Sequence, residues 1–247
     1  MTQFDPIVGV LLASSVAAAV AALGVVPQAL MGRLATPVLG WGNALASGLM
    51  LGVAYSLTTV QPDGEVLMGA GGALLGMTFV RLTHVFAGVE DLDLNELGEL
   101  DPAYGYQLFV VNTLHSAYEG VAIGVAMLVS LPFGFSMALA LAVHNIPEAM
   151  VFTAVLRDRG VKVLHAAVLA VATKLNQVLL AVVTYSVLAA LPAVLRWALG
   201  FAFGALVYLV LDELLPESYR QAGHTSIALV TLVAMGIVVA LGGGVMQ

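Results

Sequence analysis

The sequence predicts an all-α integral membrane protein with eight transmembrane helices in a single domain. Of its 247 residues, 61% are hydrophobic and 9% are charged, whereas an average soluble domain is about 25% charged. A helix needs about 20 apolar residues to cross a bilayer, and only helices or closed barrels can span lipid. Eight such runs occur, at approximately 7–31, 38–60, 66–88, 106–130, 134–156, 162–190, 192–215 and 224–246.

The composition also limits the kinds of site and partner. The chain has no cysteine, so any metal must be held by nitrogen and oxygen ligands. Six acids between positions 90 and 101 supply much of the net charge of −7, and we expect a solvated loop there and no nucleic-acid partner. The residues before the first apolar run include no basic side chain, unlike a cleaved signal peptide, so we expect a retained first span.

The basic residues predict the orientation, because cytoplasmic loops are enriched in lysine and arginine. With the N-terminus outside, the cytoplasmic side receives six basic residues: Arg33, Arg81, Arg157, Arg159, Lys162 and Arg220. The outer side receives Arg196 alone, and Lys174 lies within the sixth span. We therefore expect a multi-pass protein of the plasma (inner) membrane with both termini outside the cytoplasm.

Two His-x-x-x-Glu pairs stand in consecutive spans, His115 with Glu119 and His144 with Glu148. Residues four apart lie on one face of a helix, and ionisable groups inside a membrane are usually functional. Two imidazoles and two carboxylates around one point would suit a divalent metal. Interhelical hydrogen bonding is the alternative, and it explains one such pair better than two at matched depth.

The sixth span brings Lys174 and Gln177 to the same depth, one helical turn apart. The Lys174 ammonium can pair with Glu119 or Glu148, or stand in for a second cation. Because like charges repel in a medium of low polarity, we expect a mononuclear site. The alternative is that Lys174 faces a water-filled cavity and contacts neither acid.

Pro147 interrupts the second pair and removes the helical hydrogen bond to the carbonyl of Val143. We expect a kink there, with the freed carbonyl and Asn145 supplying further oxygen atoms. A kink that serves packing alone is the alternative.

Asp212 and Glu213 lie about twenty residues, or roughly 30 Å, into the seventh span. We expect them at the cytoplasmic mouth, separate from the midplane cluster. His84, His165 and His224 also fall near that face. Each is expected to be an ordinary interfacial histidine, and the alternative is that they pass metal on together with Glu217.

Small residues recur every four positions in the second span, at Ala44, Gly48 and Gly52. Such a face allows close contact between helices. It would serve packing within the chain or, alternatively, a homodimer.

Three motifs resemble those of the ZIP (Zrt/Irt-like protein) family of divalent metal transporters: His-Ser-x-x-Glu-Gly at 115–120, His-Asn-x-Pro-Glu at 144–148 and Asp-Glu-Leu-Leu-Pro-Glu at 212–217. The resemblance covers essentially the whole chain. It implies a 3+2+3 arrangement of spans with inverted-repeat flanks. It also implies metal uptake toward the cytoplasm by alternating access through a midplane site.

The resemblance further assigns roles by position. The primary ligands would be His115, Glu119, His144 and Glu148. Ser116 and Asn145 would adjoin a second metal, and Glu213 with Asp212 would assist the metal near the exit. Gln177 stands where many bacterial members have a carboxylate.

The sequence thus predicts a transporter and not an enzyme. Zinc is the favoured substrate, with cadmium, iron, manganese and cobalt also compatible, because nitrogen and oxygen ligands separate these cations poorly. Gln177 and Lys174 keep open a metal-binding sensor or non-transporting relative. An intramembrane metalloenzyme is less favoured, because no His-Glu-x-x-His occurs and both glutamates are needed to hold the metal.

Overall fold

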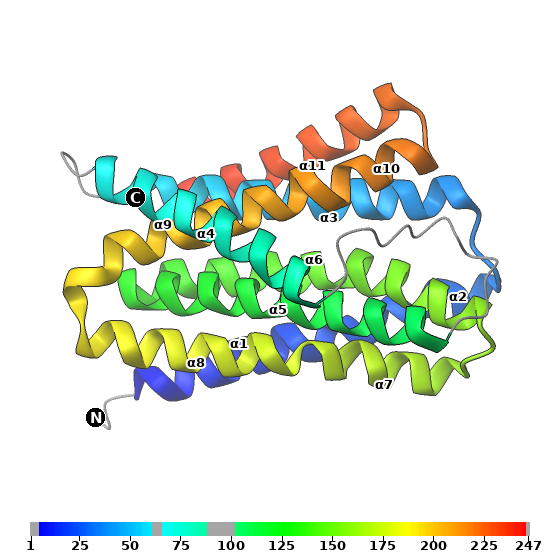
Figure 1. Cartoon of the computed structure of the whole chain (residues 1–247), viewed down its shortest axis with the longest axis horizontal. Helices are drawn as coiled ribbons and strands as arrows, with labels where there is room; N and C mark the ends of the chain where they lie inside the picture. Colours follow the sequence, from blue (N-terminus) through cyan, green and yellow to red (C-terminus); the bar gives the residue numbers. More distant parts are fainter. Residues whose placement is uncertain (1–4, 61–65, 88–101, 246–247) are drawn as a thin grey trace.

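The computed structural model describes residues 5–60, 66–87 and 102–245, and within these ranges the chain is helical without a strand. Long helices lie side by side along one axis (Figure 1). Their bounds are α1 (Pro6–Val20), η1 (Ala21–Val25), α2 (Val26–Met31), α3 (Thr36–Thr59), α4 (Val66–Ala87), α5 (Pro102–Val129), α6 (Leu131–Asp158), α7 (Val163–Thr173), α8 (Leu175–Ala190), η2 (Pro192–Val194), α9 (Leu195–Leu209), η3 (Val210–Leu214), α10 (Leu215–Gln221) and α11 (His224–Val245). The acidic stretch at 90–101 lies outside the described residues.

These helices confirm the predicted all-α membrane fold. Seven stretches of the described chain are long and apolar enough to span a bilayer. Three of them join consecutive helices: α1 to α2, α7 to α8, and η2 to α10. The remaining span is α5, whose 28 residues include Asn112, His115, Ser116 and Glu119 on its central turns. The protein is therefore a multi-pass integral membrane protein.

The packing follows the expected inverted-repeat pattern. The third span, α4, packs on α9 of the seventh span, and the eighth span, α11, packs on the second span, α3. The two contacts are equivalent if the second span corresponds to the seventh and the third to the eighth, as in an inverted repeat. In the same way, α5 packs on α8 while α6 packs on α1 and η1. The start of α1 and the end of α11 lie at the same end of the bundle (Figure 1).

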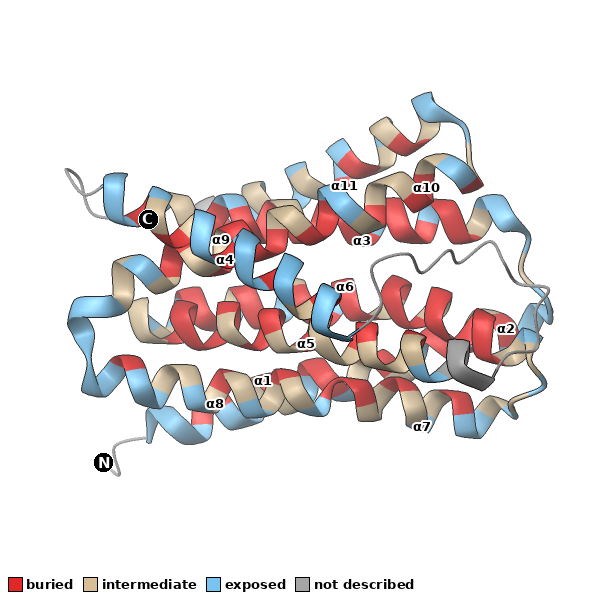
Figure 2. Ribbon diagram, viewed as in Figure 1, coloured by how far each residue is buried: buried red, intermediate tan, exposed pale blue. Residues whose placement is uncertain are grey.

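The core is centred on α3 and α6, as Figure 2 shows. In each of these helices, 72% of the apolar 18-residue segment that would cross the membrane is buried, compared with 22% in α4 and in α11. The predicted small-residue face of α3 is used within the chain. A Cβ atom at Gly52 would lie 2.6 Å from Cβ of Val238 on α11, so this face is not free for a second copy.

One predicted boundary is wrong. The seventh span was expected to end at 215, where polar residues follow, but the helix continues to Gln221. Glu217 is buried there, and its carboxylate accepts hydrogen bonds from Arg220 and Gln221. These bonds satisfy the polar side chains, so the helix continues where hydropathy falls.

Candidate metal centre

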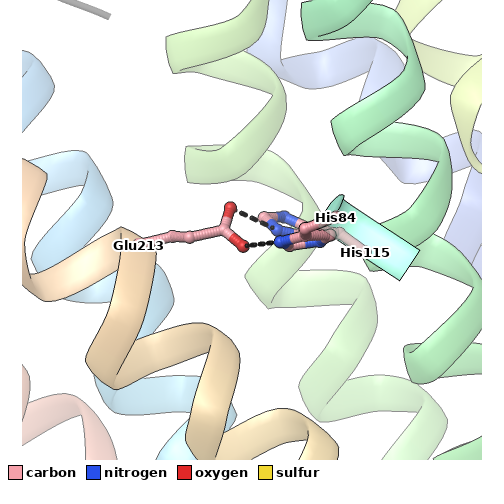
Figure 3. Close-up of side chains that lie close together, drawn as sticks. All are labelled: His84, His115 and Glu213. Carbon is pink, nitrogen blue, oxygen red and sulfur yellow. Dashed lines mark hydrogen bonds and ion pairs between the residues drawn. The ribbon is translucent and has the colours of Figure 1, made fainter. Parts of the chain in front are cut away.

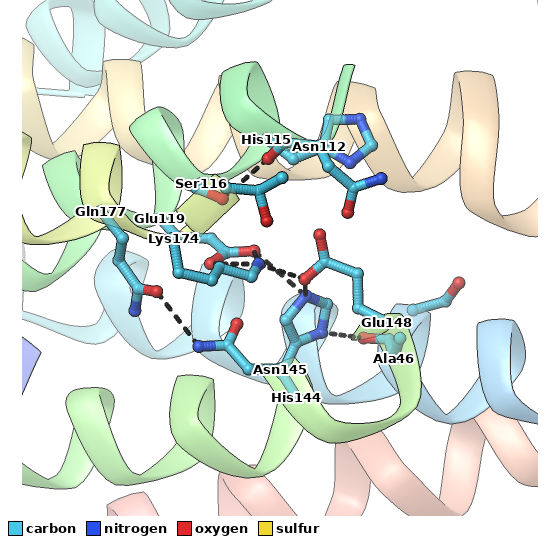
Figure 4. A network of polar contacts seen from close by, with 12 residues as sticks. Ala46, Asn112, His115, Ser116, Glu119, His144, Asn145, Glu148, Lys174 and Gln177 are labelled. Carbon is cyan, nitrogen blue, oxygen red and sulfur yellow. Dashed lines mark hydrogen bonds and ion pairs between the residues drawn. The ribbon is translucent and has the colours of Figure 1, made fainter. Parts of the chain in front are cut away.

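Three ionisable side chains meet between α5 and α6. Glu119 comes from α5, and His144 and Glu148 come from α6. One ligand atom from each lies within 4.8 Å of the others, and all three residues are buried. Nε2 of His144 lies 3.2 Å from Oε1 of Glu119 and 3.4 Å from Oε2 of Glu148 (Figure 4). We call these three residues the central cluster.

A backbone contact orients the imidazole of His144. Its Nδ1 lies 2.9 Å from the carbonyl oxygen of Ala46 on α3. A carbonyl can only accept, so Nδ1 carries the hydrogen and Nε2 is the nitrogen that faces the carboxylates. Histidines that bind metals are commonly held by such a bond from the second ring nitrogen. The arrangement therefore prepares Nε2 to bind a cation.

Lys174 enters the central cluster from the break between α7 and α8. Its Nζ donates to Oε1 and Oε2 of Glu119, at 3.2 and 3.1 Å, and also to Oε2 of Glu148. The chain thus contains both of the ion pairs that the sequence suggested. Lys174 does not face a water-filled cavity, because it is only 1% exposed.

Neutral side chains complete the wall beside these charges. Nδ2 of Asn145 donates to Ala17 O at 2.8 Å and to Oε1 of Gln177 at 3.1 Å. Oδ1 of Asn145 and Oε1 of Glu148 are buried and have no hydrogen-bond partner among the described residues. These two oxygens are the kind of atom that a bound cation would satisfy.

Two further predicted residues lie on the same helices. Ser116 is buried on α5, and its hydroxyl donates to the carbonyl oxygen of Asn112 at 2.7 Å (Figure 4). Pro147 is buried inside α6, one residue before Glu148.

A second cluster forms from His84 on α4, His115 on α5 and Glu213 on η3 (Figure 3). Oε1 of Glu213 lies 2.9 Å from Nδ1 of His84, and Oε2 lies 2.9 Å from Nε2 of His115. The sequence placed His115 with the other three ligands around one point, whereas here it contacts Glu213. Because His115 and Glu119 are four residues apart on α5, the two clusters are about 6 Å apart along the helix.

The expectation that Asp212 and Glu213 lie apart from the midplane residues is therefore wrong for Glu213. The expectation assumed that the seventh span ended at 215. Because the helix runs to Gln221, Glu213 lies eight residues, or about 12 Å, before its end and contacts His115. Asp212 is exposed and belongs to neither cluster.

A π-helical turn, Val210–Leu214, carries Glu213. The N–H of Leu215 donates to Val210 O, five residues back. Pro216 explains this wider turn, because it has no N–H to offer the carbonyl of Asp212 in the α-helical pattern. Turns of this type inside α-helices are frequent at functional sites.

His84 was expected to be an ordinary interfacial histidine, but it is buried with 4% exposure and pairs with Glu213. His165 and His224 are exposed, as an interfacial position predicts. A signal for His84 was present in the sequence. The buried face of α4 follows helical spacing: Gly69, Gly72, Gly76, Val80 and His84. The glycines mark the packed face, and His84 continues it.

Comparison with known proteins identifies the family of the chain. The family profile described as "ZIP Zinc transporter" matches residues 95–246. The chain belongs to the ZIP family. It is 31% identical over 225 residues to the zinc transporter GufA of Myxococcus xanthus, which covers 85% of this chain and 88% of that protein.

Two longer proteins are also similar to this chain. A protein named as a candidate zinc transporter in Arabidopsis thaliana is 30% identical over 203 residues, or 81% of this chain. The zinc transporter ZIP13 of Pongo abelii is 29% identical over 203 residues, or 80% of this chain. The match spans 33% of the Arabidopsis protein and 61% of the Pongo protein, so the chain covers only part of the length of these two relatives.

Proposed function

We propose that this ZIP protein carries a divalent metal cation, zinc foremost, across the membrane toward the cytoplasm by alternating access. The observation that carries the proposal is the central cluster of Glu119, His144 and Glu148, buried among membrane-spanning helices. One imidazole nitrogen and two carboxylates form a ligand set that zinc accepts, and that cadmium, iron, manganese and cobalt accept as well. The two carboxylates neutralise a dication, which lowers the cost of burying it.

The second cluster supports a direction for the movement. It shares helix α5 with the central cluster, through His115 and Glu119. It also contains Glu213, beyond which lie α10 and the basic residue Arg220. With the basic loops on the cytoplasmic side, metal would pass from the central cluster to His84, His115 and Glu213 on its way inward. The protein would then lie in the plasma membrane with both termini on the side away from the cytoplasm.

We further propose that the central cluster holds one metal. One dication balances the two carboxylates and takes the place of the Lys174 ammonium, which lies 3.1 Å from Oε2 of Glu119 in the structure. The displaced ammonium stays tethered nearby, and at an effective dielectric of about 20 an ammonium and a second dication about 4 Å apart would repel by about 8 kcal/mol. Calorimetry on a Glu213→Gln variant, in which the second cluster is weakened, should give one metal per chain. Two metals per chain would contradict the mononuclear site.

Uptake into proteoliposomes tests the function itself. Wild-type protein is expected to take up zinc, cadmium or iron(II), and His144→Ala should reduce uptake to the level of protein-free vesicles. His165→Ala is the matched control, because His165 is an exposed histidine on α7. Binding without flux for every cation in the wild type would favour a metal sensor instead.

A further inference from the structure

Lys174 occupies the ligand atoms that a metal in the central cluster would need. Its ammonium donates to both oxygens of Glu119 and to Oε2 of Glu148. Nε2 of His144 lies within 3.4 Å of the same two carboxylates. A cation bound by His144, Glu119 and Glu148 must therefore displace the ammonium, and Lys174 can return when the cation leaves.

The backbone around Lys174 is suited to such a displacement. Lys174 stands at the end of α7, with its N–H bonded to Val171 O and Ala172 O, and α8 begins at the next residue. The side chain therefore projects from a break in the sixth span and not from the middle of a continuous helix. It is a long, flexible chain whose only charge is at its tip.

The charge of the empty site depends on this residue. Two carboxylates and one ammonium give a net charge of −1, and removal of the ammonium would leave −2. The cost of keeping charge in a medium of low polarity rises steeply with its size. A carrier that lacks the ammonium and must change its access while empty would therefore be slowed by an uncompensated pair of carboxylates. In the same carrier a bound dication would neutralise that pair.

We propose that Lys174 is a tethered cation that takes the place of the metal in the empty carrier and so permits its return. This inference deepens the proposed transport function and rests on it. Lys174 would make the protein a net transporter. Without that positive charge, the carrier would switch between its outward-open and inward-open states readily only with a metal bound. It would then exchange a metal ion on one side for a metal ion on the other, without net uptake.

Two flux measurements on the same proteoliposomes test the role. Net uptake is followed with labelled zinc entering metal-free vesicles, and exchange is followed with labelled zinc entering vesicles preloaded with unlabelled zinc. The ratio of net uptake to exchange does not depend on how much protein is folded. For Lys174→Met we expect this ratio to fall about tenfold or more, because only the empty step loses its charge compensation.

Two further variants sharpen the result. Lys174→Arg keeps the positive charge and should keep a ratio near that of the wild type, even if its total flux is lower. Lys162→Met is the matched control, because Lys162 is exposed at the start of α7, and both fluxes should be unchanged. A Lys174→Met ratio equal to that of the wild type would overturn the tethered-cation role. Absence of both fluxes in the wild type would instead overturn the transport function on which it rests.

Discussion

Replacing Gly120 with alanine tests how closely α5 packs on α8 beside the central cluster. A Cβ atom at Gly120 would lie 3.0 Å from both the Cα and the carbonyl carbon of Gln177, and closer still to its carbonyl oxygen. Carbon atoms pack best at about 3.5–4.0 Å, so the backbone of α8 must move outward by about 0.5–1 Å. Gln177 would carry this movement to Asn145, whose Nδ2 it binds at 3.1 Å.

The magnitude is best measured against a glycine with free space around it. Gly236 lies on α11, and no atom lies within 4 Å of a Cβ placed there. Both substitutions gain the same intrinsic helix propensity, about 1 kcal/mol, so their difference isolates the steric cost. Overpacking of this kind costs about 1–3 kcal/mol. For a protein of this size that corresponds to a Tm lower by about 2–12 °C in Gly120→Ala than in Gly236→Ala.

Thermal unfolding of the two purified variants in detergent measures this difference directly. Zinc affinity, measured on the same samples, should be weaker in Gly120→Ala because the wall of the central cluster has moved. Equal Tm values together with unchanged zinc affinity would refute the reasoning, since α5 and α8 would then have room for a methyl group.

Three other substitutions give expected outcomes. His84→Gln should slow zinc uptake about tenfold by weakening the second cluster, while zinc affinity at the central cluster changes by less than about threefold; an unchanged rate would remove His84 from the path. Pro216→Ala restores a backbone N–H and should favour an α-helical turn, turning Glu213 away from its histidines; uptake should fall to the level of Glu213→Gln, and hydrogen exchange across 210–214 should slow. Glu217→Leu leaves the amide of Gln221 without its acceptor, which should cost about 1–3 kcal/mol and lower the Tm without changing the zinc concentration at half-maximal uptake.

Much of the fold could be predicted from the sequence, because each membrane span corresponds to a continuous apolar run. The observed bounds of α3 (Thr36–Thr59) and α11 (His224–Val245) lie within two residues of the runs at 38–60 and 224–246. The end of the seventh span could not be predicted from hydropathy. Its last turns are polar, and they are helical because side chains such as Glu217 find partners within the folded chain.

The candidate site was predictable to the extent that it depends on spacing along one helix. The spacing of His144 and Glu148 placed both side chains on one face of α6, and they do converge on Glu119. The position of Lys174, at the same depth, predicted its pairing with the carboxylates. Spacing along one helix cannot predict which side chain on another helix a residue contacts. His115 is an example.

His115 lies one turn from Glu119, so the sequence alone would assign both to one metal. Its partner is decided by two features outside α5: the π-helical turn that aims Glu213, and the glycine-lined face of α4 that brings His84 close. The carboxylate of Glu213 then bridges the two imidazoles, at 2.9 Å to each. A His-x-x-x-Glu pair in a membrane helix can therefore contribute to two adjacent clusters instead of one, with His115 in contact with Glu213 and Glu119 in contact with His144.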